Sequence, residues 1–334
     1  MTRPQVFLTH GPSALANYYG ERALAALRAV ADVRLHDSDA PWTLDALAAA
    51  AQHCDIVVSD RRAEGPAALL QRLPRLAAFV RCAVDIRNID VPAASALGIL
   101  VTQASAGFAA SVSEWVFGTM IDLSRGISDA VGRYRAGASP VAGMGRELRG
   151  ATLGVIGFGQ IGRNVVALGQ AFGMHVLVSD PHRRVEEPAV TQVSLPQLLA
   201  DADIVVCLAT ATPETENLMD TAAFRAMKHG ALFVNASRGN LVDEAALLHA
   251  LDSGRLAGAA LDVGRAPDQM PSPALARHPR VIATPHIGGL TLPAIEHQSM
   301  ETARQVADIV AGRMPVGAVN ADAAQRVRAR FVTP

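Results

Sequence analysis

The stretch Leu153-Gly154-Val155-Ile156-Gly157-Phe158-Gly159-Gln160-Ile161-Gly162 decides the fold of this chain. Its first four residues form an apolar run typical of a buried β-strand, and a helical pattern opens within the glycine motif. Gly157 permits a tight turn, Gly159 lets the backbone come close to a pyrophosphate, and Gly162 lets helix and strand pack closely. The helix would present free N–H groups to a phosphate anion. The stretch therefore predicts a dinucleotide-binding turn.

A carboxylate follows this turn at a distance that strengthens the prediction. The next β-type run, residues 175–179, ends in Asp180. That spacing is close to the roughly 20 residues at which an acidic side chain meets the ribose 2′-hydroxyl. Asp180 would repel a 2′-phosphate, which favours NAD over NADP, although Arg183 and Arg184 keep the phosphorylated cofactor open. A glycine turn that packs without a ligand is the less favoured interpretation.

Short β-type runs alternate with helical patterns through most of the chain, which is typical of parallel α/β sheets. The first series of runs comprises residues 6–9, 33–36, 56–59, 76–83 and 99–102. The second series comprises residues 152–156, 175–179, 204–208, 231–235, 257–262 and 281–283. We therefore expect two doubly wound parallel sheets.

The helical patterns indicate that the two domains are interleaved. Residues 109–125 read as a helix, and residues 126–150, rich in glycine and arginine, read as an arm without a clear strand. A long helix at 292–313 follows the second series, and its natural partner is the first sheet because no strands come after it. We expect a discontinuous domain of residues 1–104 and 290–334, with residues 105–289 inserted as a second domain.

Composition excludes several classes of protein. Of 334 residues, 50% are hydrophobic and 18% are charged, so the chain is not disordered. A formal net charge of −1 and an aromatic content of 4% do not fit a nucleic-acid binder. No leader and no run of about 20 apolar residues is seen, so we expect a soluble, cytoplasmic protein without membrane contact. Cys54, Cys82 and Cys207 lie in or beside apolar runs and are expected to be reduced core thiols.

Two polar residues follow predicted strands of the second series. Arg238 comes after residues 231–235, at the edge where open α/β sheets bind ligands. A guanidinium can hold a carboxylate by two hydrogen bonds, although an isolated arginine at a strand end is more often a structural ion pair. His286 lies in a proline–glycine turn after residues 281–283 and can exchange a proton near neutral pH. A lone histidine there is more often a turn residue. Arg238, His286 and the dinucleotide-binding turn together, however, favour interconversion of a carbonyl and an alcohol by hydride transfer.

Motifs in a fixed order make the chain resemble the D-isomer-specific 2-hydroxyacid dehydrogenases from about residue 79 to residue 312. They are the glycine turn with Asp180, Thr212-Pro213-Glu214-Thr215, Met227-Lys228, Asn235-Ala236-Ser237-Arg238-Gly239, Ala260-Leu261-Asp262-Val263 and Thr284-Pro285-His286-Ile287-Gly288-Gly289. The resemblance implies a split substrate-binding domain, an inserted NAD-binding Rossmann domain, a cleft between them, and a homodimer built mainly through the NAD domain and its arm. It also implies a structural role for Lys228, the sole lysine of the chain.

The resemblance assigns roles to individual residues. Arg238 would bind the substrate carboxylate and orient its carbonyl, and His286 would be the general acid in reduction and the base in oxidation. Backbone N–H groups around Val84 and Asp85 would contact the substrate carboxylate, and Asp262 would face the nicotinamide end of the cofactor. The other cofactor contacts would come from Gly157, Gly159, Gln160, Ile161, Gly162, Asp180, Ala209, Thr210, Ala236 and Gly288, with Arg238 and His286. No metal ligand is expected.

The chain departs from the family pattern beside the histidine. The family places a glutamate five residues after the aspartate that matches Asp262, and here that position is Pro267, whose side chain cannot hold an imidazole. A one-residue shift makes Asp268 the orienting acid, and a carboxylate there would raise the pKa of His286. Gln269 is the rival, because formate dehydrogenases of this superfamily use a glutamine beside the histidine.

Two further positions differ from the family. Asp85 and Arg87 stand where a glycine and an aspartate are common, and an acidic side chain near an anionic substrate is unfavourable unless Arg81 or Arg87 pairs with it. Thr210 replaces a proline and could give the nicotinamide ribose a hydroxyl partner. The motifs do not define the substrate side chain: Phe108, Trp115 and Met144 are pocket candidates but are more often core residues at such spacing.

These residues lead to one principal hypothesis and two alternatives. The principal hypothesis is an NAD-dependent D-2-hydroxyacid dehydrogenase, which reduces a small 2-keto acid or oxidises the 2-hydroxy acid. Formate or phosphite oxidation on the same scaffold is the alternative within the class. A non-catalytic scaffold that senses NAD is the alternative outside it, and the absence of an appended tail for recruiting partners counts against it.

Overall fold

The computed structural model describes residues 3–332, without the side chain of Asp268. By their internal contacts the residues form two compact units, of which unit 1 is Met1–Gly107 with Thr291–Pro334 and unit 2 is Phe108–Leu290. The second unit is therefore inserted into the chain of the first. Which unit binds substrate and which binds NAD stays a prediction.

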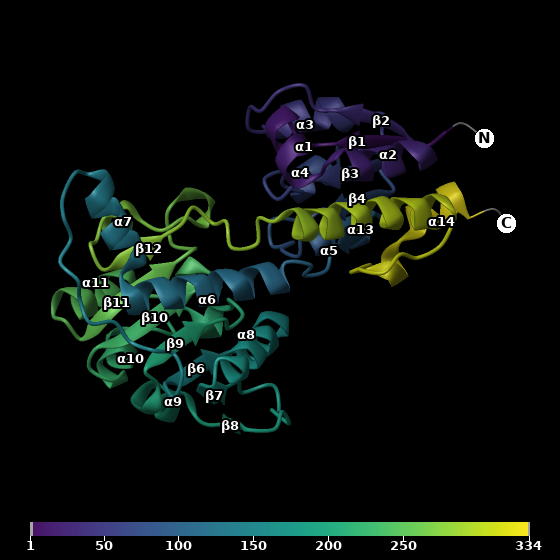
Figure 1. Cartoon of the computed structure of the whole chain (residues 1–334). Coiled ribbons are helices and arrows are strands. Elements are labelled where there is room, and N and C mark those ends of the chain that lie inside the picture. Colours follow the sequence, from purple (N-terminus) through teal and green to yellow (C-terminus); the bar gives the residue numbers. More distant parts are fainter. Residues whose placement is uncertain (1–2, 333–334) are drawn as a thin grey trace. The chain divides into compact units, whose positions relative to one another are not determined.

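Unit 1 is built on a five-stranded parallel sheet in the order β2-β1-β3-β4-β5 (Figure 1). Its strands are β1 (Gln5–Leu8), β2 (Asp32–Leu35), β3 (Ile56–Ser59), β4 (Ala78–Arg81) and β5 (Leu100–Gln103). Its helices are α1 (Pro12–Tyr18), α2 (Glu21–Val30), α3 (Leu44–Ala51), α4 (Ala67–Leu70), α5 (Val91–Ala96), α13 (Leu292–Val310), η4 (Ala321–Ala323) and α14 (Gln325–Phe331). The long helix α13 packs against α2 and β4 and places Val306 and Ile309 in the core of this sheet.

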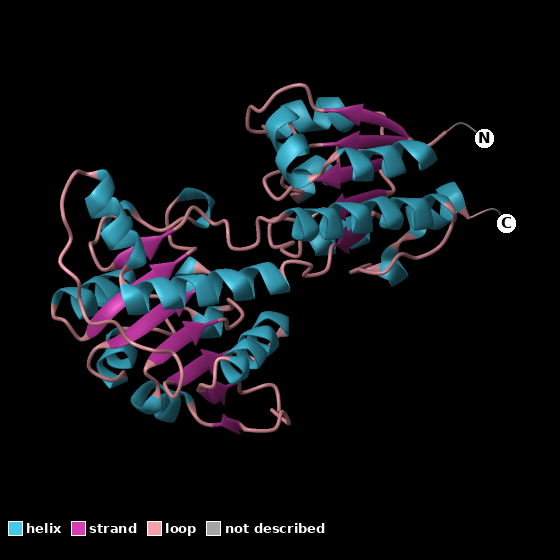
Figure 2. Ribbon diagram, viewed as in Figure 1, coloured by secondary structure: helices cyan, strands magenta, loops and turns pink. Residues whose placement is uncertain are grey.

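Unit 2 is built on a seven-stranded parallel sheet in the order β12-β11-β10-β9-β6-β7-β8. Its strands are β6 (Thr152–Ile156), β7 (His175–Ser179), β8 (Val190–Gln192), β9 (Ile204–Cys207), β10 (Ala231–Asn235), β11 (Leu256–Leu261) and β12 (Val281–Ala283). Its helices are α6 (Ala109–Arg125), α7 (Ile127–Arg135), α8 (Gln160–Ala171), α9 (Leu195–Asp201), η1 (Pro213–Thr215), α10 (Thr221–Ala226), η2 (Gly239–Leu241), α11 (Glu244–Asp252), η3 (Pro267–Gln269) and α12 (Pro273–Ala276). Helices cover both faces of the sheet (Figure 2). Strands β7 and β8 lie on one side of β6, and β9 to β12 lie on the other, so the strand order changes direction between β6 and β9. Such sheets bind ligands at this position.

The predicted fold class, two doubly wound parallel sheets, is confirmed. The sequence analysis missed two elements. Strand β8 was not predicted, because it has only three residues at the sheet edge and no apolar run. Helix α7 was not predicted within the arm, because it lies in a glycine- and arginine-rich segment and none of its residues is buried, although Ile127, Val131 and Tyr134 stand at helical spacing.

The three cysteines lie in the cores and are unpaired, as predicted. Cys54 and Cys82 belong to the core of unit 1, and Cys207 ends β9 in unit 2. Burial raises the pKa of the Cys82 and Cys207 thiols to about 12. Because the thiolate is the nucleophilic form, these groups are unreactive at neutral pH.

The three pocket candidates differ in their surroundings. Phe108 and Trp115 are partly buried and pack against the core of unit 2, in agreement with the core interpretation. Met144 is fully exposed in the segment after α7, so it is not a core residue. That segment carries no helix or strand between residues 136 and 151.

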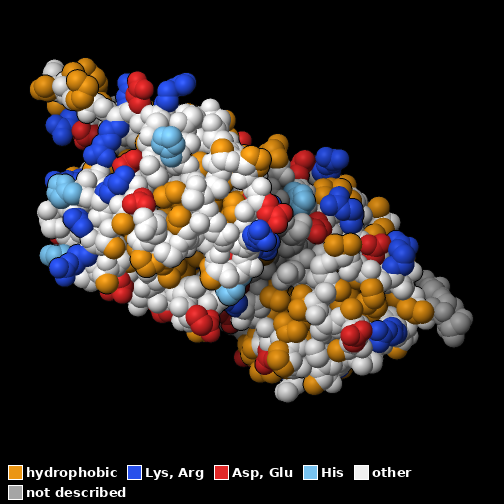
Figure 3. Space-filling view, turned by 90° about the horizontal axis from the view of Figure 1, so that it is seen from below, with side chains coloured by type: hydrophobic (Ala, Val, Ile, Leu, Met, Phe, Trp, Pro, Cys, Tyr) orange, Lys and Arg blue, Asp and Glu red, His pale blue; other side chains and the backbone are white. Residues whose placement is uncertain are grey.

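Charged side chains of both signs are interspersed on the surface. On the face drawn in Figure 3, basic and acidic groups lie beside one another without a large region of one sign. Basic and acidic residues are nearly equal in number, which gives a formal net charge of −1. Within residues 3–332, no helix is both long and apolar enough to cross a membrane.

Candidate functional site

The glycine turn after β6 leaves open space at the N-terminus of α8. Gly157 has a φ of +96°, and a Cβ there would lie 2.7 Å from the Leu208 carbonyl oxygen. A Cβ on Gly162 would lie 2.3 Å from the carbonyl oxygen of Gly157, whereas one on Gly159 would meet no atom within 4 Å. The first N–H groups of a helix have no intrahelical acceptor. Packing therefore requires glycine at positions 157 and 162. Gly159 faces open space beside the free N–H groups of α8, and these donors fit a pyrophosphate.

Asp180 ties the end of β7 to this turn. One of its carboxylate oxygens accepts the backbone N–H of Phe158 at 2.7 Å. The other accepts the N–H groups of His182 and Arg183 at 2.8 and 3.0 Å. The carboxylate is thus held by the main chain beside the glycine turn, in the position from which we expect it to select the ribose hydroxyl.

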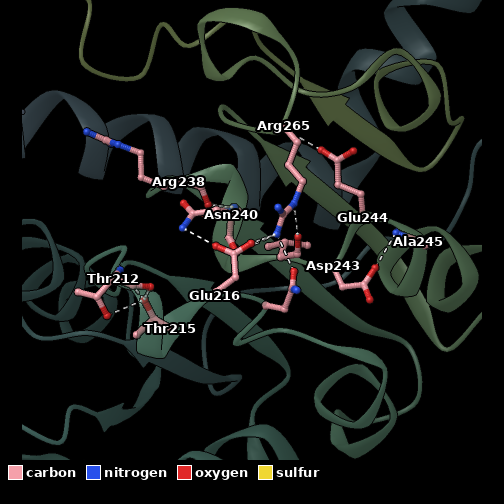
Figure 4. Close-up of polar contacts among 12 residues, drawn as sticks. Thr212, Thr215, Glu216, Arg238, Asn240, Asp243, Glu244, Ala245 and Arg265 are labelled. Carbon is pink, nitrogen blue, oxygen red and sulfur yellow. Dashed lines mark hydrogen bonds and ion pairs between the residues drawn. The ribbon is translucent and has the colours of Figure 1, made fainter. Parts of the chain in front are cut away.

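Arg238 stands in a turn closed by the last residue of β10. The side chain of Asn235 donates to the Arg238 carbonyl oxygen at 3.0 Å and accepts the Ser237 N–H at 3.1 Å. The Arg238 guanidinium, which is half-buried, donates to the Ser237 carbonyl oxygen at 2.8 Å. Its side chain points away from Glu216 (Figure 4). The turn after β10, closed by Asn235, therefore places the Arg238 guanidinium at the carboxyl edge of the sheet.

The carboxylate of Asp262, at the end of β11, holds the turn that carries His286. One oxygen accepts the Thr284 hydroxyl at 2.6 Å and the Ile287 N–H at 2.8 Å, and the other accepts the Gly288 N–H at 2.7 Å. Asp262 is 4% exposed. Its predicted contact with the nicotinamide stays a prediction. Sequence reasoning missed this bracing role, because the bonds join residues 22 to 26 positions apart on two neighbouring strands.

His286 adopts a backbone conformation that histidine rarely takes. Its φ is +56°, and its N–H donates to the Thr284 carbonyl oxygen at 2.9 Å. A left-handed conformation costs a residue with a Cβ about 1–2 kcal/mol. The bonds from Asp262 to both sides of the turn offset this cost. Strain that the surroundings maintain is typical of functional positions, and here it fixes where the imidazole can lie.

The segment that replaces the family glutamate is the short helix η3. Gln269 has a φ of +59°, and its amide oxygen is buried without a hydrogen-bond partner among the residues that the structure describes. The Asp268 side chain, our predicted orienting acid, lies outside the described part. The choice between these two residues therefore stays open.

Three predicted cofactor contacts lie in loops that the structure places next to each other. The Ser237 hydroxyl, in the turn with Ala236, donates to the Ala209 carbonyl oxygen at 2.5 Å. The Thr215 hydroxyl donates to the Thr210 carbonyl oxygen at 2.8 Å. The first bond joins the loop after β9 to the loop after β10, and the second closes the loop after β9 on itself. The contacts of Ala209, Thr210 and Ala236 with a cofactor stay predictions.

In unit 1, the predicted substrate loop contains a paired carboxylate. The Arg87 guanidinium meets both carboxylate oxygens of Asp85, at 2.6 Å between Nη2 and Oδ2 and 3.0 Å between Nε and Oδ1. Of the two partners expected for Asp85, Arg87 is thus present. Arg81 is fully buried and donates instead to the Asp60 carbonyl oxygen and the Asn88 side chain. The ion pair lowers the electrostatic cost of placing Asp85 near an anion.

The sole lysine has a structural partner. Lys228 Nζ lies 2.9 Å from a carboxylate oxygen of Asp203, whose other oxygen accepts the Thr152 N–H at 2.8 Å. Lys228 therefore ties the loop before β10 to the starts of β6 and β9.

Comparison with known proteins places these loops in a family context. The model of the D-isomer specific 2-hydroxyacid dehydrogenase, NAD binding domain, matches residues 117–288. The glyoxylate reductase of Aeropyrum pernix is 31% identical over 331 residues, which cover 96% of this chain and 97% of that protein. The D-3-phosphoglycerate dehydrogenase of Mycobacterium leprae is 34% identical over 312 residues, which cover 92% of this chain but 58% of that protein.

Solved structures share the whole architecture. The TT0316 protein of Thermus thermophilus has a TM-score of 0.86 at 28% identity, covering 94% of this chain and 99% of that one. Apo D-lactate dehydrogenase of Escherichia coli has a TM-score of 0.81 at 26% identity, with 94% and 99% covered. The chain spans about half the length of the phosphoglycerate dehydrogenases that it matches.

Proposed function

The chain belongs to the D-isomer-specific 2-hydroxyacid dehydrogenases, and from this premise we propose that it transfers a hydride between NAD(H) and a small 2-keto or 2-hydroxy acid. One observation carries the proposal. The glycine turn, Asp180, Arg238 and His286 follow β6, β7, β10 and β12, so all four are at the carboxyl edge of the same parallel sheet. A dinucleotide site, a carboxylate-binding group and a proton donor are thus gathered where such sheets bind ligands.

Each group has a chemical task in the proposed reaction. NADH, when bound, supplies the hydride that reduces the keto carbon. Arg238 holds the substrate carboxylate through its planar guanidinium and polarises the carbonyl. His286 donates a proton to the carbonyl oxygen in reduction and accepts it in oxidation. Backbone N–H groups at Val84 and Asp85 hold the substrate carboxylate from unit 1, and the D configuration follows from family membership.

The histidine also needs a group that fixes its ring. We keep Asp268 in that role, because a carboxylate would stabilise the imidazolium that protonates the substrate. The buried amide oxygen of Gln269, which has no described partner, supports the alternative, since an imidazole N–H would satisfy it. Replacing Asp268→Asn and Gln269→Ala separates the two. If Asp268 acts, its variant loses activity at the alkaline end of the pH profile for reduction; an unchanged profile assigns the role to Gln269.

The decisive experiment combines a substrate panel with one variant. In the direction of reduction, glyoxylate and other 2-keto acids are tested with NADH and NADPH. In the direction of oxidation, D-3-phosphoglycerate, formate and phosphite are tested with NAD. Absorbance of the reduced cofactor measures every reaction. We expect turnover of a 2-keto acid with NADH. Arg238→Ala should lose at least about 100-fold in kcat/KM while NADH binding survives. If only formate or phosphite is turned over, the protein is a formate or phosphite dehydrogenase on the same scaffold. NAD binding without any turnover would indicate the sensing scaffold.

We also propose a cytoplasmic homodimer. The exposed apolar side chains of α7 and the following segment support the dimer; they are Ile127, Val131, Tyr134, Val141 and Met144. Such a row of apolar groups in an arm is typical of an interface. Three buried, unpaired cysteines fit a reducing compartment. Sedimentation equilibrium with the Tyr134→Glu variant tests the dimer.

A further inference from the structure

Arg265, in the loop after β11, contacts two other loops at the carboxyl edge of the sheet in unit 2 (Figure 4). Its Nη2 lies 2.8 Å from Glu216 Oε1, 2.6 Å from Asn217 Oδ1 and 3.0 Å from the Asn240 carbonyl oxygen. Its Nε donates to the Val242 carbonyl oxygen at 3.1 Å. One side chain that begins in the loop after β11 therefore reaches the loops after β9 and β10.

Further bonds close these contacts into a ring. The Asn240 side chain donates to Glu216 Oε2 at 2.9 Å, and the Arg265 N–H donates to Glu244 Oε1 at 3.0 Å. Bonds from Asn240 and Arg265 hold the pKa of Glu216 below its usual value, so the carboxylate remains charged toward the guanidinium. An exposed ion pair alone would contribute little to stability. A guanidinium shared among four acceptors instead fixes the geometry of the backbone that presents them.

Backbone packing also joins two of these loops, the ones after β10 and β11. A Cβ on Gly239, the residue after Arg238, would lie 2.1 Å from the Gly264 carbonyl carbon. A Cβ on Gly264 would lie 2.5 Å from Pro271 Cα, and the Gly264 N–H donates to the Gln269 carbonyl oxygen at 2.8 Å. The Arg238 turn, Gly264 and η3 are therefore stacked without intervening side chains. A shift of one displaces the others.

We propose that Arg265 is a positioning residue for the reaction: it fixes the Arg238 turn against η3 and thereby sets the position of the Arg238 guanidinium. The inference rests on the proposed function. Arg265 acts through Asn240, Glu216 and the stacked glycines, while the Arg238 side chain points away from this cluster (Figure 4). Losing the ring leaves the fold of the sheet in place but lets the Arg238 turn move.

The test compares Arg265→Ala with a matched control. Arg313 makes an exposed ion pair with Asp308 at 2.6 Å in unit 1, and Arg313→Ala removes a similar guanidinium far along the chain. We expect Arg265→Ala to lose on the order of 10- to 100-fold in kcat/KM for the 2-keto acid, because small displacements of orienting groups have effects of this size. The Kd for NADH should change by less than about twofold. Arg313→Ala should match the wild type in both.

Further variants test whether Arg265 and Glu216 act through the same hydrogen-bonded ring. Glu216→Gln should lose part of the same activity, and Glu216→Gln with Arg265→Ala should lose no more than Arg265→Ala alone, because both act through one network. Arg265→Lys, which keeps a charge but not the planar fork, should be intermediate, and it serves if the alanine variant does not fold. Additive losses, or a kcat/KM for Arg265→Ala equal to that of the control, would overturn the proposal.

Hydrogen exchange tests the positioning role of Arg265 independently of catalytic activity. In Arg265→Ala, peptides covering residues 236–243 and 264–271 should both exchange faster, and peptides from β6 to β9 should not change. If the wild type turns over no 2-keto acid, the proposed function fails, and the exchange still decides whether Arg265 holds the two loops together. Unchanged exchange in both peptides would refute the positioning role whatever the activity.

Discussion

The two sheets begin with the same local structure and use it differently. In unit 2, β6 is followed by Gly157-Phe158-Gly159 and α8; in unit 1, β1 is followed by Thr9-His10-Gly11 and α1. Phe158 and His10 are both fully buried. Gly159 and Gly11 both precede the first residue of their helix. The two turns therefore share a strand–turn–helix layout but differ in their first residue: Gly157 has a φ of +96°, a left-handed conformation that Thr9 does not adopt.

The two turns also differ in what surrounds the glycine that precedes each helix. A Cβ on Gly159 would meet open space, but one on Gly11 would lie 2.3 Å from the Ser38 carbonyl oxygen. The carboxylate of Asp39 accepts the Ser13 N–H at 3.0 Å and the Ser13 hydroxyl at 2.6 Å. An anion of the chain itself thus stands at the start of α1, where a helix attracts negative charge. Unit 1 has no opening for a phosphate at this helix, and the comparison explains why one doubly wound sheet is predicted to bind a dinucleotide and the other is not.

The largest expected effect comes from filling the turn in unit 2. Gly159→Val should lower NAD affinity by at least about 100-fold, because the side chain occupies the space in which the pyrophosphate would lie. Its melting temperature should change little, since a Cβ there meets no atom within 4 Å. Isothermal titration with NAD and a melting curve measure the two effects. Gly11→Val is the matched control: it should lower stability and leave NAD affinity unchanged. Normal NAD binding by Gly159→Val would contradict the assignment of the site.

A smaller effect concerns pH and distinguishes His10 from Phe158. Burial lowers the pKa of His10 to about 4, Asp60 opposes the shift, and Arg81 and Arg62 add to it. Between pH 6.5 and about 4 the unfolded chain binds a proton that the folded chain does not, so stability falls as the pH falls through this window. A shift of this size corresponds to about 3 kcal/mol.

The His10→Phe variant makes the turn of unit 1 resemble that of unit 2 and tests this dependence. Its stability should fall less steeply from pH 6.5 to pH 4 than that of the wild type, whatever its absolute stability. Hydrogen exchange in peptides of unit 1 at several pH values measures the slope, and peptides of unit 2 serve as the internal control. Equal slopes for variant and wild type would show that His10 does not titrate in this way.

The smallest expected effect comes from removing the carboxylate at α1. Hydrogen bonds from Ser13 hold the pKa of Asp39 below its usual value, so Asp39 is charged at neutral pH. Asp39→Ala should lower the melting temperature by a few degrees at most, because the contact is exposed. NAD affinity should stay unchanged, since Ser38 still closes the turn. A gain of a second NAD site in titration would show that Asp39 alone had blocked it.

Local patterns predicted most of the fold. Runs 56–59, 152–156, 175–179, 231–235 and 281–283 became strands with the same bounds, because buried parallel strands are continuous apolar runs. Strand β8 buries too little to leave such a pattern, and the apolar stripe of helix α7 lies in a segment rich in glycine and arginine. The sequence also identified the strand ends that carry Gly157, Arg238 and His286, since the end of an apolar run and the turn residues after it are local properties of the sequence.

The supporting contacts of the site could not be predicted in this way. Asp262 reaches the His286 turn on the neighbouring strand, and Arg265 reaches Glu216 past the intervening strand β10, so both contacts depend on the assembled sheet. No short motif encodes a hydrogen bond between residues 49 positions apart. The choice between Asp268 and Gln269 depends on the same long-range geometry, which is why alignment to a motif left both open.

The insertion of unit 2 has a consequence for synthesis on the ribosome. Val306 and Ile309 of α13 fill the core of unit 1, and Arg330 of α14 lies 3.1 Å from the buried Asp55. Residues 1–107 therefore emerge without helix α13, and the apolar face that it covers stays open until residues 291–334 have been made. Unit 2 is continuous and complete by Leu290, so it can finish folding first. During that interval the unfinished first unit is the part of the nascent chain that most needs protection by chaperones.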